Sequence, residues 1–125
     1  RWIMRLFGRM ARPFFRYQSC QPDIAVEERL DLEPFGFEGY ILHTPGHTRG
    51  SMSVVVEDRI ALVGDTLFGM LPGSVLPPYA DDIPAMVKSW RKLLDTPCER
   101  FLSGHGQEIK RALLERKYAK YSRLG

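Results

Sequence analysis

Two apolar runs in the middle of the chain place the tightest constraint on its fold. Residues 52–56 and 60–63 are largely apolar, and the charged triplet at 57–59 separates them. This spacing predicts a hairpin of two short strands joined by a tight turn. The hairpin is too hydrophobic to face water on both sides, and one layer of helices covers only one face of a sheet. The sequence therefore predicts a sheet with a second apolar face that needs a partner.

Further strands are predicted on both sides of this hairpin. Apolar and polar residues alternate from Ile24 to Leu32, which is typical of a half-buried strand pair or a bent strand. Residues 40–42 and 100–103 predict two more short strands. We therefore expect an α/β chain with a mixed sheet of at least four strands.

Two helices are predicted to cover one face of the sheet. Asp81 or Asp82 can cap a helix that begins near Pro84, because proline suits a first helical turn. A last helix is predicted over residues 107–121. The apolar residues expected on the buried faces are Ile83, Met86, Val87, Trp90, Leu93 and Leu94 in the first helix and Ile109, Ala112, Leu113 and Tyr118 in the second.

The first 22 residues differ in character from residues 23–125. Residues 1–20 contain five arginines and no acidic residue, so they contribute +5 to a net charge of +3 and leave −2 for the rest. The spacing of residues 2–16 predicts an amphipathic basic helix, which could lie on a membrane surface, cover a substrate pocket or simply pack with a solvated face. Because the positive charge is local, a nucleic-acid partner is not expected.

Cysteine content and hydropathy indicate in which cellular compartment the chain is expected. Cys20 and Cys98 are too few for a disulfide framework, so we expect free thiols. No apolar run approaches the roughly 20 residues of a membrane-spanning helix, and the start of the chain lacks the pattern of a signal peptide. We therefore expect a cytoplasmic location and do not expect membrane attachment. The chain also begins at Arg1 with no helix-start signal, so we expect that further sequence precedes it.

Three segments combine residues that could bind metal. The stretch 42–51 reads L-H-T-P-G-H-T-R-G-S, residues 64–66 read G-D-T, and residues 104–106 read G-H-G. Each follows or ends a predicted strand, at the rim of the sheet where loops bring distant residues together. Imidazole and carboxylate groups suit zinc and related divalent metals. Taken singly, each segment also fits an ordinary hydrogen-bonded histidine or an aspartate in a turn.

Together, in this order, the three segments resemble the second half of the metallo-β-lactamase superfamily, nearest to its glyoxalase-II-like hydrolases. The resemblance runs from about Ile24 to about Ala119. It implies one half of an αβ/βα sandwich, with residues 23–125 forming the C-terminal half of a metallo-β-lactamase-fold domain. The sheet of that half would carry its helices on the outer face.

The resemblance also implies a two-zinc site, with iron or manganese as alternative metals. His47 matches the histidine that completes the first metal site, Asp65 the carboxylate that bridges both metals, and His105 a ligand of the second. No other catalytic residue is implied. His43 matches a position that is not a ligand, and we expect it to pack or orient its loop. The implied reaction is attack by metal-bound hydroxide on a thioester, lactone or related small-molecule ester.

One part of the family pattern has no counterpart in these residues. The H-x-H-x-D-H signature is absent, so we expect this chain to be a fragment that is inactive alone. The N-terminal half of the same fold, or a second copy, would cover the open sheet face. Two alternatives remain: a non-catalytic half-domain that serves binding or assembly, and a nucleic-acid-processing member of the superfamily.

The segment 67–79, which follows Asp65, is apolar and rich in glycine and proline. It suits the wall of a substrate pocket, since such walls are mostly apolar. It equally suits a connector packed on the helix that follows. The sequence leaves both interpretations open.

Overall fold

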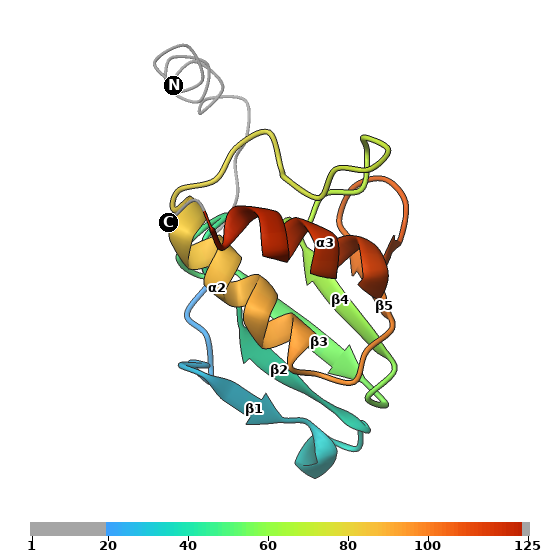
Figure 1. Cartoon of the computed structure of the whole chain (residues 1–125). Helices are drawn as coiled ribbons and strands as arrows, with labels where there is room; N and C mark the ends of the chain where they lie inside the picture. The colour runs from blue at the N-terminus through green and yellow to red at the C-terminus, as the bar shows by residue number, and fades with distance from the viewer. Residues whose placement is uncertain (1–19, 124–125) are drawn as a thin grey trace.

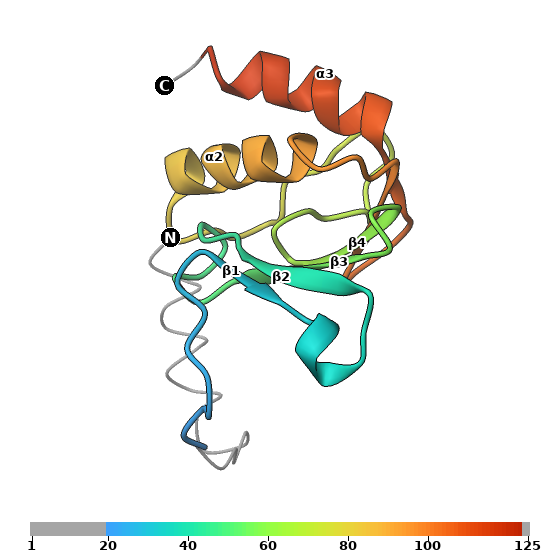
Figure 2. The ribbon, with the colours of Figure 1, turned by 90° about the horizontal axis from the view of Figure 1, so that it is seen from below.

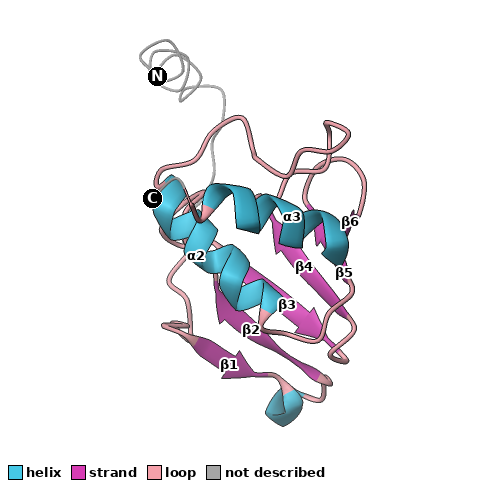
Figure 3. Cartoon of the chain, viewed as in Figure 1, coloured by secondary structure: helices cyan, strands magenta, loops and turns pink. Residues whose placement is uncertain are grey.

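A computed structural model describes residues 20–123, in which one mixed sheet carries two helices on the same face (Figures 1 and 2). The six strands lie in chain order, and only β4 and β5 run parallel. The strands are β1 (Arg29–Asp31), β2 (Gly39–His43), β3 (Met52–Val56), β4 (Ile60–Gly64), β5 (Arg100–Ser103) and β6 (Ile109–Lys110) (Figure 3). The helices are the 3-10 turn η1 (Glu33–Phe35) and the α-helices α2 (Ile83–Leu94) and α3 (Arg111–Tyr121). This arrangement confirms the predicted fold class. The helix predicted over residues 2–16, and most of the segment 1–22, lie outside the described residues.

The predicted hairpin is formed by β3 and β4. Its turn is closed by a hydrogen bond of 3.0 Å from the Arg59 N–H to the Val56 carbonyl. Glu57 and Asp58 have φ angles of 50° and 51°. Positive φ at both central residues matches the twist of the flanking strands, as in type I′ turns.

The parallel pair β4 and β5 fixes where the candidate site forms. Parallel strands need a long crossover, and here loop 65–82 and α2 provide it. Because the two strands point the same way, their carboxyl ends meet at one edge of the sheet. Asp65 directly follows β4 and His105 follows β5, so both reach the same edge.

The core lies between the helices and one face of the sheet. Alternate strand residues such as Val55, Val63 and Phe101 are fully buried there, against Trp90 of α2 and Leu114 of α3. The Asp82 carboxylate accepts a hydrogen bond of 2.9 Å from the Ala85 N–H, which confirms the predicted cap of α2.

The opposite face of the sheet is apolar and open. Met52 and Leu62 are 48% and 45% exposed, and Val56 is exposed beside them. Both helices lie on the other side (Figure 2). The second apolar face that the hairpin sequence predicts is therefore present.

The predicted start and buried face of the last helix are partly wrong. The last helix begins at Arg111, because Ile109 pairs with Phe101 in β6. Leu114 is its most buried residue, whereas Ala112 is exposed. Burial of one apolar residue is compatible with a strand or a helix, so spacing alone could not separate the two.

Two expectations near other element ends also differ from the structure. Ile83 is half exposed, because it lines a surface pocket with Tyr118 and Tyr121 of α3 instead of facing the sheet. The strand expected within residues 24–32 is limited to β1, and Ile24 lies in an exposed segment before it.

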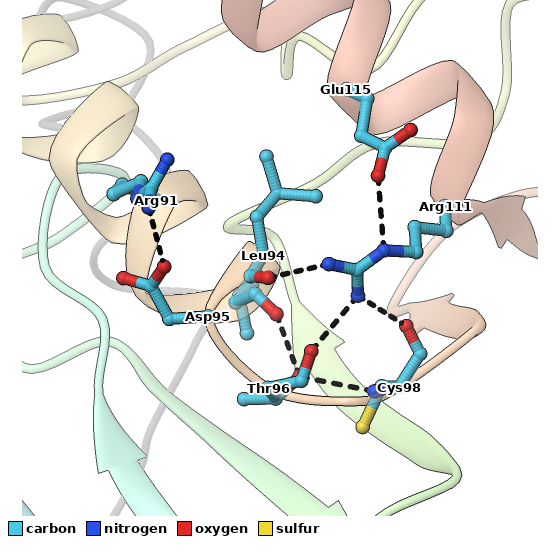
Figure 4. Close-up of polar contacts among 8 residues, drawn as sticks. Arg91, Leu94, Asp95, Thr96, Cys98, Arg111 and Glu115 are labelled. Carbon is cyan, nitrogen blue, oxygen red and sulfur yellow. Dashed lines mark hydrogen bonds and ion pairs between the residues drawn. The ribbon is translucent and has the colours of Figure 1, made fainter.

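The Arg111 guanidinium joins three segments of the chain (Figure 4). It donates to the carbonyl of Leu94 at 2.6 Å, of Thr96 at 2.9 Å and of Cys98 at 3.0 Å, and its Nε donates to Glu115 at 3.0 Å. Carbonyls at the end of a helix lack partners within that helix. Arg111 therefore caps α2, orders the turn into β5 and attaches α3 to both.

Neither α-helix in the part of the chain described here has the length and apolar character needed to cross a membrane. Both cysteines, Cys20 and Cys98, are free, as the sequence predicts. Burial raises the pKa of the Cys98 thiol.

Replacing Arg111 by methionine keeps most of its apolar stem and removes every donor to the three carbonyls. We expect Arg111→Met to lower the free energy of unfolding by about 2 to 4 kcal/mol, because partly buried carbonyls lose their partners. Urea denaturation followed by circular dichroism measures this change. Arg116→Met, on the exposed side of the same helix, is the control and should change stability by less than about 0.5 kcal/mol. Equal effects of the two substitutions would contradict the proposed role of Arg111.

Candidate metal centre

Three residues from different loops meet at the edge where β4 and β5 end. The Nε2 atom of His47 lies 3.5 Å from Oδ2 of Asp65. The Nε2 atom of His105 lies 3.6 Å from Oδ1 of the same carboxylate. The structure thus brings together all three residues that the sequence motifs single out, and each imidazole faces a different oxygen.

These separations suit two ligands of a shared cation better than a hydrogen bond. Direct hydrogen bonds to nitrogen span about 2.7 to 3.2 Å. Two ligands held about 2.0 to 2.2 Å from a tetrahedral zinc ion lie roughly 3.3 Å from one another. The His47–Asp65 pair and the His105–Asp65 pair each have about that spacing. Asp65 thus forms two adjacent pairs, one with each histidine, and each pair is a candidate metal half-site.

The His47 ring is held by a hydrogen bond of 2.8 Å between its Nδ1 atom and the Tyr79 carbonyl oxygen. A carbonyl can only accept, so Nδ1 must carry the proton. In the neutral ring Nε2 then has its lone pair free and directed toward Asp65. Metal-binding histidines are commonly oriented in this way by a hydrogen bond at their second nitrogen.

Backbone contacts between two loops position His105. The Gly104 N–H donates to the Gly64 carbonyl at 3.0 Å, and the Gly69 N–H donates to the His105 carbonyl at 2.9 Å. A Cβ atom on Gly106, whose φ is 89°, would lie 2.3 Å from the Gly69 carbonyl carbon. A Cβ atom on Gly104 would lie 3.0 Å from Oδ1 of Asp65. Gly106 is therefore required where the His105 loop meets Gly69, and a side chain at Gly104 would crowd the Asp65 carboxylate.

His43 does not join this group. Its Nε2 atom donates to the Arg49 carbonyl at 2.8 Å, which fixes the loop between β2 and β3. This contact agrees with the expected role of His43 in orienting that loop.

The donor set is suitable for zinc but incomplete. Within residues 20–123 no three His, Cys, Asp or Glu side chains surround a single point that could hold a metal ion. The two histidines face opposite oxygens of Asp65, so each candidate half-site has only one imidazole nitrogen and one carboxylate oxygen. Catalytic zinc sites usually have three protein ligands, so each candidate half-site would need further donors to hold zinc.

The segment 67–79 has features of both interpretations that the sequence left open. Leu67 and Val75 are buried in the core, as expected of a packed connector. Met70 and Leu71 are 61% and 64% exposed, while the Phe68 ring lies 5.5 Å from the His105 ring. The exposed tip stays a predicted pocket wall.

Sequence reasoning missed the buried polar groups beneath the site. Thr44, Ser53 and Thr66 are fully buried, and their hydroxyls form one connected group. The Trp90 indole N–H donates to the Thr66 carbonyl at 2.8 Å. Thr44 and Thr66 lie within the T-P-G-H and G-D-T motifs. Their place in these motifs was the only feature of the sequence that could have indicated a structural role for them.

The orientation of His47 predicts the tautomer of its neutral ring. Nitrogen-15 NMR of the imidazole should detect a proton on Nδ1 and none on Nε2, because the Tyr79 carbonyl can only accept. His43 is the internal control, since its Nε2 donates to a carbonyl and its tautomer should be the opposite. Detection of the same tautomer for both rings would contradict this geometry.

Comparisons with known proteins agree with the fold and the motifs. Residues 4–105 match the sequence profile of the metallo-beta-lactamase superfamily. A lactamase-like protein of Pestalotiopsis microspora is 36% identical over 64% of this chain and 25% of its own length. A hydroxyacylglutathione hydrolase of Rhodopseudomonas palustris is 35% identical over 66% of this chain and 32% of its own length. An atrochrysone carboxyl ACP thioesterase of Passalora fulva is 28% identical over 86% of this chain and 32% of its own length.

Solved structures show the same fold. An archaeal metallo-beta-lactamase superfamily protein from Sulfolobus tokodaii has a TM-score of 0.64 at 23% identity, covering 93% of this chain and 47% of that one. A metallo-beta-lactamase family protein from Thermus thermophilus has a TM-score of 0.59 at 25% identity, covering 85% of this chain and 36% of that one. The chain thus spans about a quarter to a third of the three relatives and at most about half of these two structures. On these grounds the chain belongs to the metallo-beta-lactamase superfamily.

Proposed function

We propose that this chain carries part of the two-metal centre of a hydrolase that cleaves thioesters, lactones or related esters. One observation supports this proposal most strongly. The two oxygens of Asp65 each face one imidazole nitrogen, at 3.5 and 3.6 Å, so a single carboxylate can serve two cations.

Each residue has a distinct proposed role. His47 binds the first metal, His105 binds the second, and Asp65 bridges them. Zinc suits this mixture of nitrogen and oxygen donors, and iron and manganese are also compatible. When bound, divalent metals supply Lewis acidity that lowers the pKa of water and polarises a carbonyl group. The chain itself holds the carboxylate and both imidazoles in fixed relative positions.

The choice of substrate class is supported by two relatives. One is named a hydroxyacylglutathione hydrolase and another an ACP thioesterase. Both names describe hydrolysis of an acyl thioester. The exposed apolar tip at Met70 and Leu71, next to the ring pair of Phe68 and His105, suits the apolar part of such a substrate.

The remaining metal ligands are proposed to come from a complementary half of the fold. The chain has three histidines, and His43 is engaged with the Arg49 carbonyl. A half that carries the H-x-H-x-D-H signature would supply the missing donors and cover the open sheet face at Met52 and Leu62. A second copy of this chain would cover that face but would add no such signature.

A non-catalytic role in binding or assembly is the second candidate. It is favoured by the incomplete donor set and the open apolar face, both of which a module that only binds a partner could have. A cytoplasmic location stays a prediction, which the free thiols of Cys20 and Cys98 support.

Metal analysis and hydrolysis assays separate these candidates. The full-length gene product should bind two zinc ions and hydrolyse a member of a thioester, lactone and ester panel, whereas residues 1–125 alone should bind zinc weakly and form dimers by light scattering. Asp65→Asn should abolish tight zinc binding and activity, because a neutral amide is a poor bridge. Asp23→Asn, on an exposed segment, is the control and should change neither.

Two results would contradict the hydrolase proposal. One is full-length protein that folds but binds no zinc, iron or manganese. The other is zinc binding that is unaffected by Asp65→Asn. Turnover by residues 1–125 alone at about 1 s⁻¹ or faster would instead refute the need for a complementary half.

A further inference from the structure

We propose that Thr66 is a positioning residue that sets the distance between His47 and Asp65, and so controls the first metal half-site separately from the second. The inference rests on the proposed metal centre. It starts from a connected group of buried hydroxyls, Thr44, Ser53 and Thr66, that lies beneath the loops carrying the candidate ligands.

The hydroxyl group of Thr66 links two loops. It donates to the Thr44 carbonyl at 3.3 Å and lies 3.4 Å from the Thr44 hydroxyl. The Thr44 hydroxyl is in turn 2.8 Å from the Ser53 hydroxyl in β3. Thr66 follows Asp65 in the chain, and Thr44 precedes His47 by three residues. The contact therefore links the residue after Asp65 to the loop that carries His47, through two separations longer than the usual range of about 2.5 to 3.0 Å.

Helix α2 forms hydrogen bonds to both loops, at Thr66 and at Pro45. Its Trp90 donates from Nε1 to the Thr66 carbonyl at 2.8 Å. Its Ser89 donates from Oγ to the Pro45 carbonyl at 2.7 Å. The Trp90 bond is buried and meets little competition from water, whereas the Ser89 bond is partly buried. Together they attach both loops to α2.

The second half-site is held by other contacts. His105 is tied to the end of β4 through the backbone bonds of Gly104 to Gly64 and of Gly69 to His105. The Ser103 hydroxyl also donates to the His105 carbonyl at 2.7 Å, and none of these contacts involves Thr66. The Asp81 and Asp82 N–H groups also hold the His47 loop, donating to the His47 and Gly46 carbonyls at 3.1 and 2.9 Å. Loss of the Thr66 hydroxyl should therefore shift the Thr44 end of that loop relative to Asp65 without detaching it, and should leave the His105 loop in place. Metal–ligand distances in working sites vary by only about 0.2 Å, so a small shift of one loop matters.

The test uses zinc affinity measured on the full-length protein by competition with a chromophoric chelator. Thr66→Val removes the hydroxyl at nearly constant volume, and Thr66→Ser keeps it. Thr96→Val is the matched control, because Thr96 is also a buried threonine whose hydroxyl donates to a carbonyl, that of Leu93 at 2.6 Å, within the Arg111 contacts. Thermal unfolding of every variant measures the loss of stability separately.

We expect Thr66→Val to weaken one of two bound zinc ions by about ten- to a hundredfold, the range for loss of a group that orients a ligand, and to leave the other nearly unchanged. Thr66→Ser should restore wild-type affinity. Thr96→Val should lower the unfolding temperature and leave both affinities as they are. If Thr66→Val does not fold, Trp90→Phe removes the other bond to Thr66 and should weaken the same zinc ion.

The alternatives are distinguishable. Unchanged affinities in Thr66→Val, equal weakening of both ions, or equal weakening by Thr96→Val would overturn the role of Thr66 while leaving the metal centre intact. Wild-type protein that binds no zinc, iron or manganese would overturn the proposed function, and this inference with it.

Discussion

The parallel pairing of β4 with β5 is the contact on which the rest of the structure depends. It is the one parallel pair among the strands of residues 20–123, and it requires the α2 crossover that builds the core. It also brings the ends of both strands to one edge. The pairing continues beyond the strands through Gly104 to Gly64 and through the bridge between Gly69 and Gly106. Asp65 and His105 therefore meet because the sheet itself extends to them.

His47 is not positioned by the parallel strand pair, and the buried polar groups beneath it take over that role. Its loop lies between antiparallel strands, so no ladder ties it to β4 at that position. The buried hydroxyls and α2 provide the tie instead, and the Tyr79 carbonyl sets the ring. Two imidazoles that face one carboxylate from separately held loops form a geometry that a pair of cations would stabilise. The complementary half of the fold that we propose would cover the open apolar face and would supply the further donors of both half-sites.

Strong local patterns predicted much of this structure. The hairpin followed from two apolar runs around a charged turn, and α2 followed from its apolar spacing and the capping aspartate. The meeting of His47, Asp65 and His105 was predicted because each lies at a strand end and because the three motifs resemble those of the metal centre in the metallo-β-lactamase superfamily. These features depend on residues near one another in sequence or on strand direction, which pattern and motif can report.

Other features depend on contacts that no local pattern encodes. The start of α3 could not be placed, because Ile109 is buried equally well in a strand or a helix. Arg111 gave no signal, since its partners are main-chain carbonyls at Leu94, Thr96 and Cys98. The buried hydroxyls were missed because serine and threonine are expected at the surface, and only the tertiary fold shows them joined.

Anomalous diffraction at the zinc edge, from crystals of the full-length protein grown with zinc, tests the central claim most directly. The account predicts two peaks, one between Oδ2 of Asp65 and Nε2 of His47 and the other between Oδ1 of Asp65 and Nε2 of His105. Each peak should lie about 2.0 to 2.2 Å from these atoms. Zinc bound elsewhere, or both imidazoles turned away from Asp65 in a zinc-loaded crystal, would contradict it.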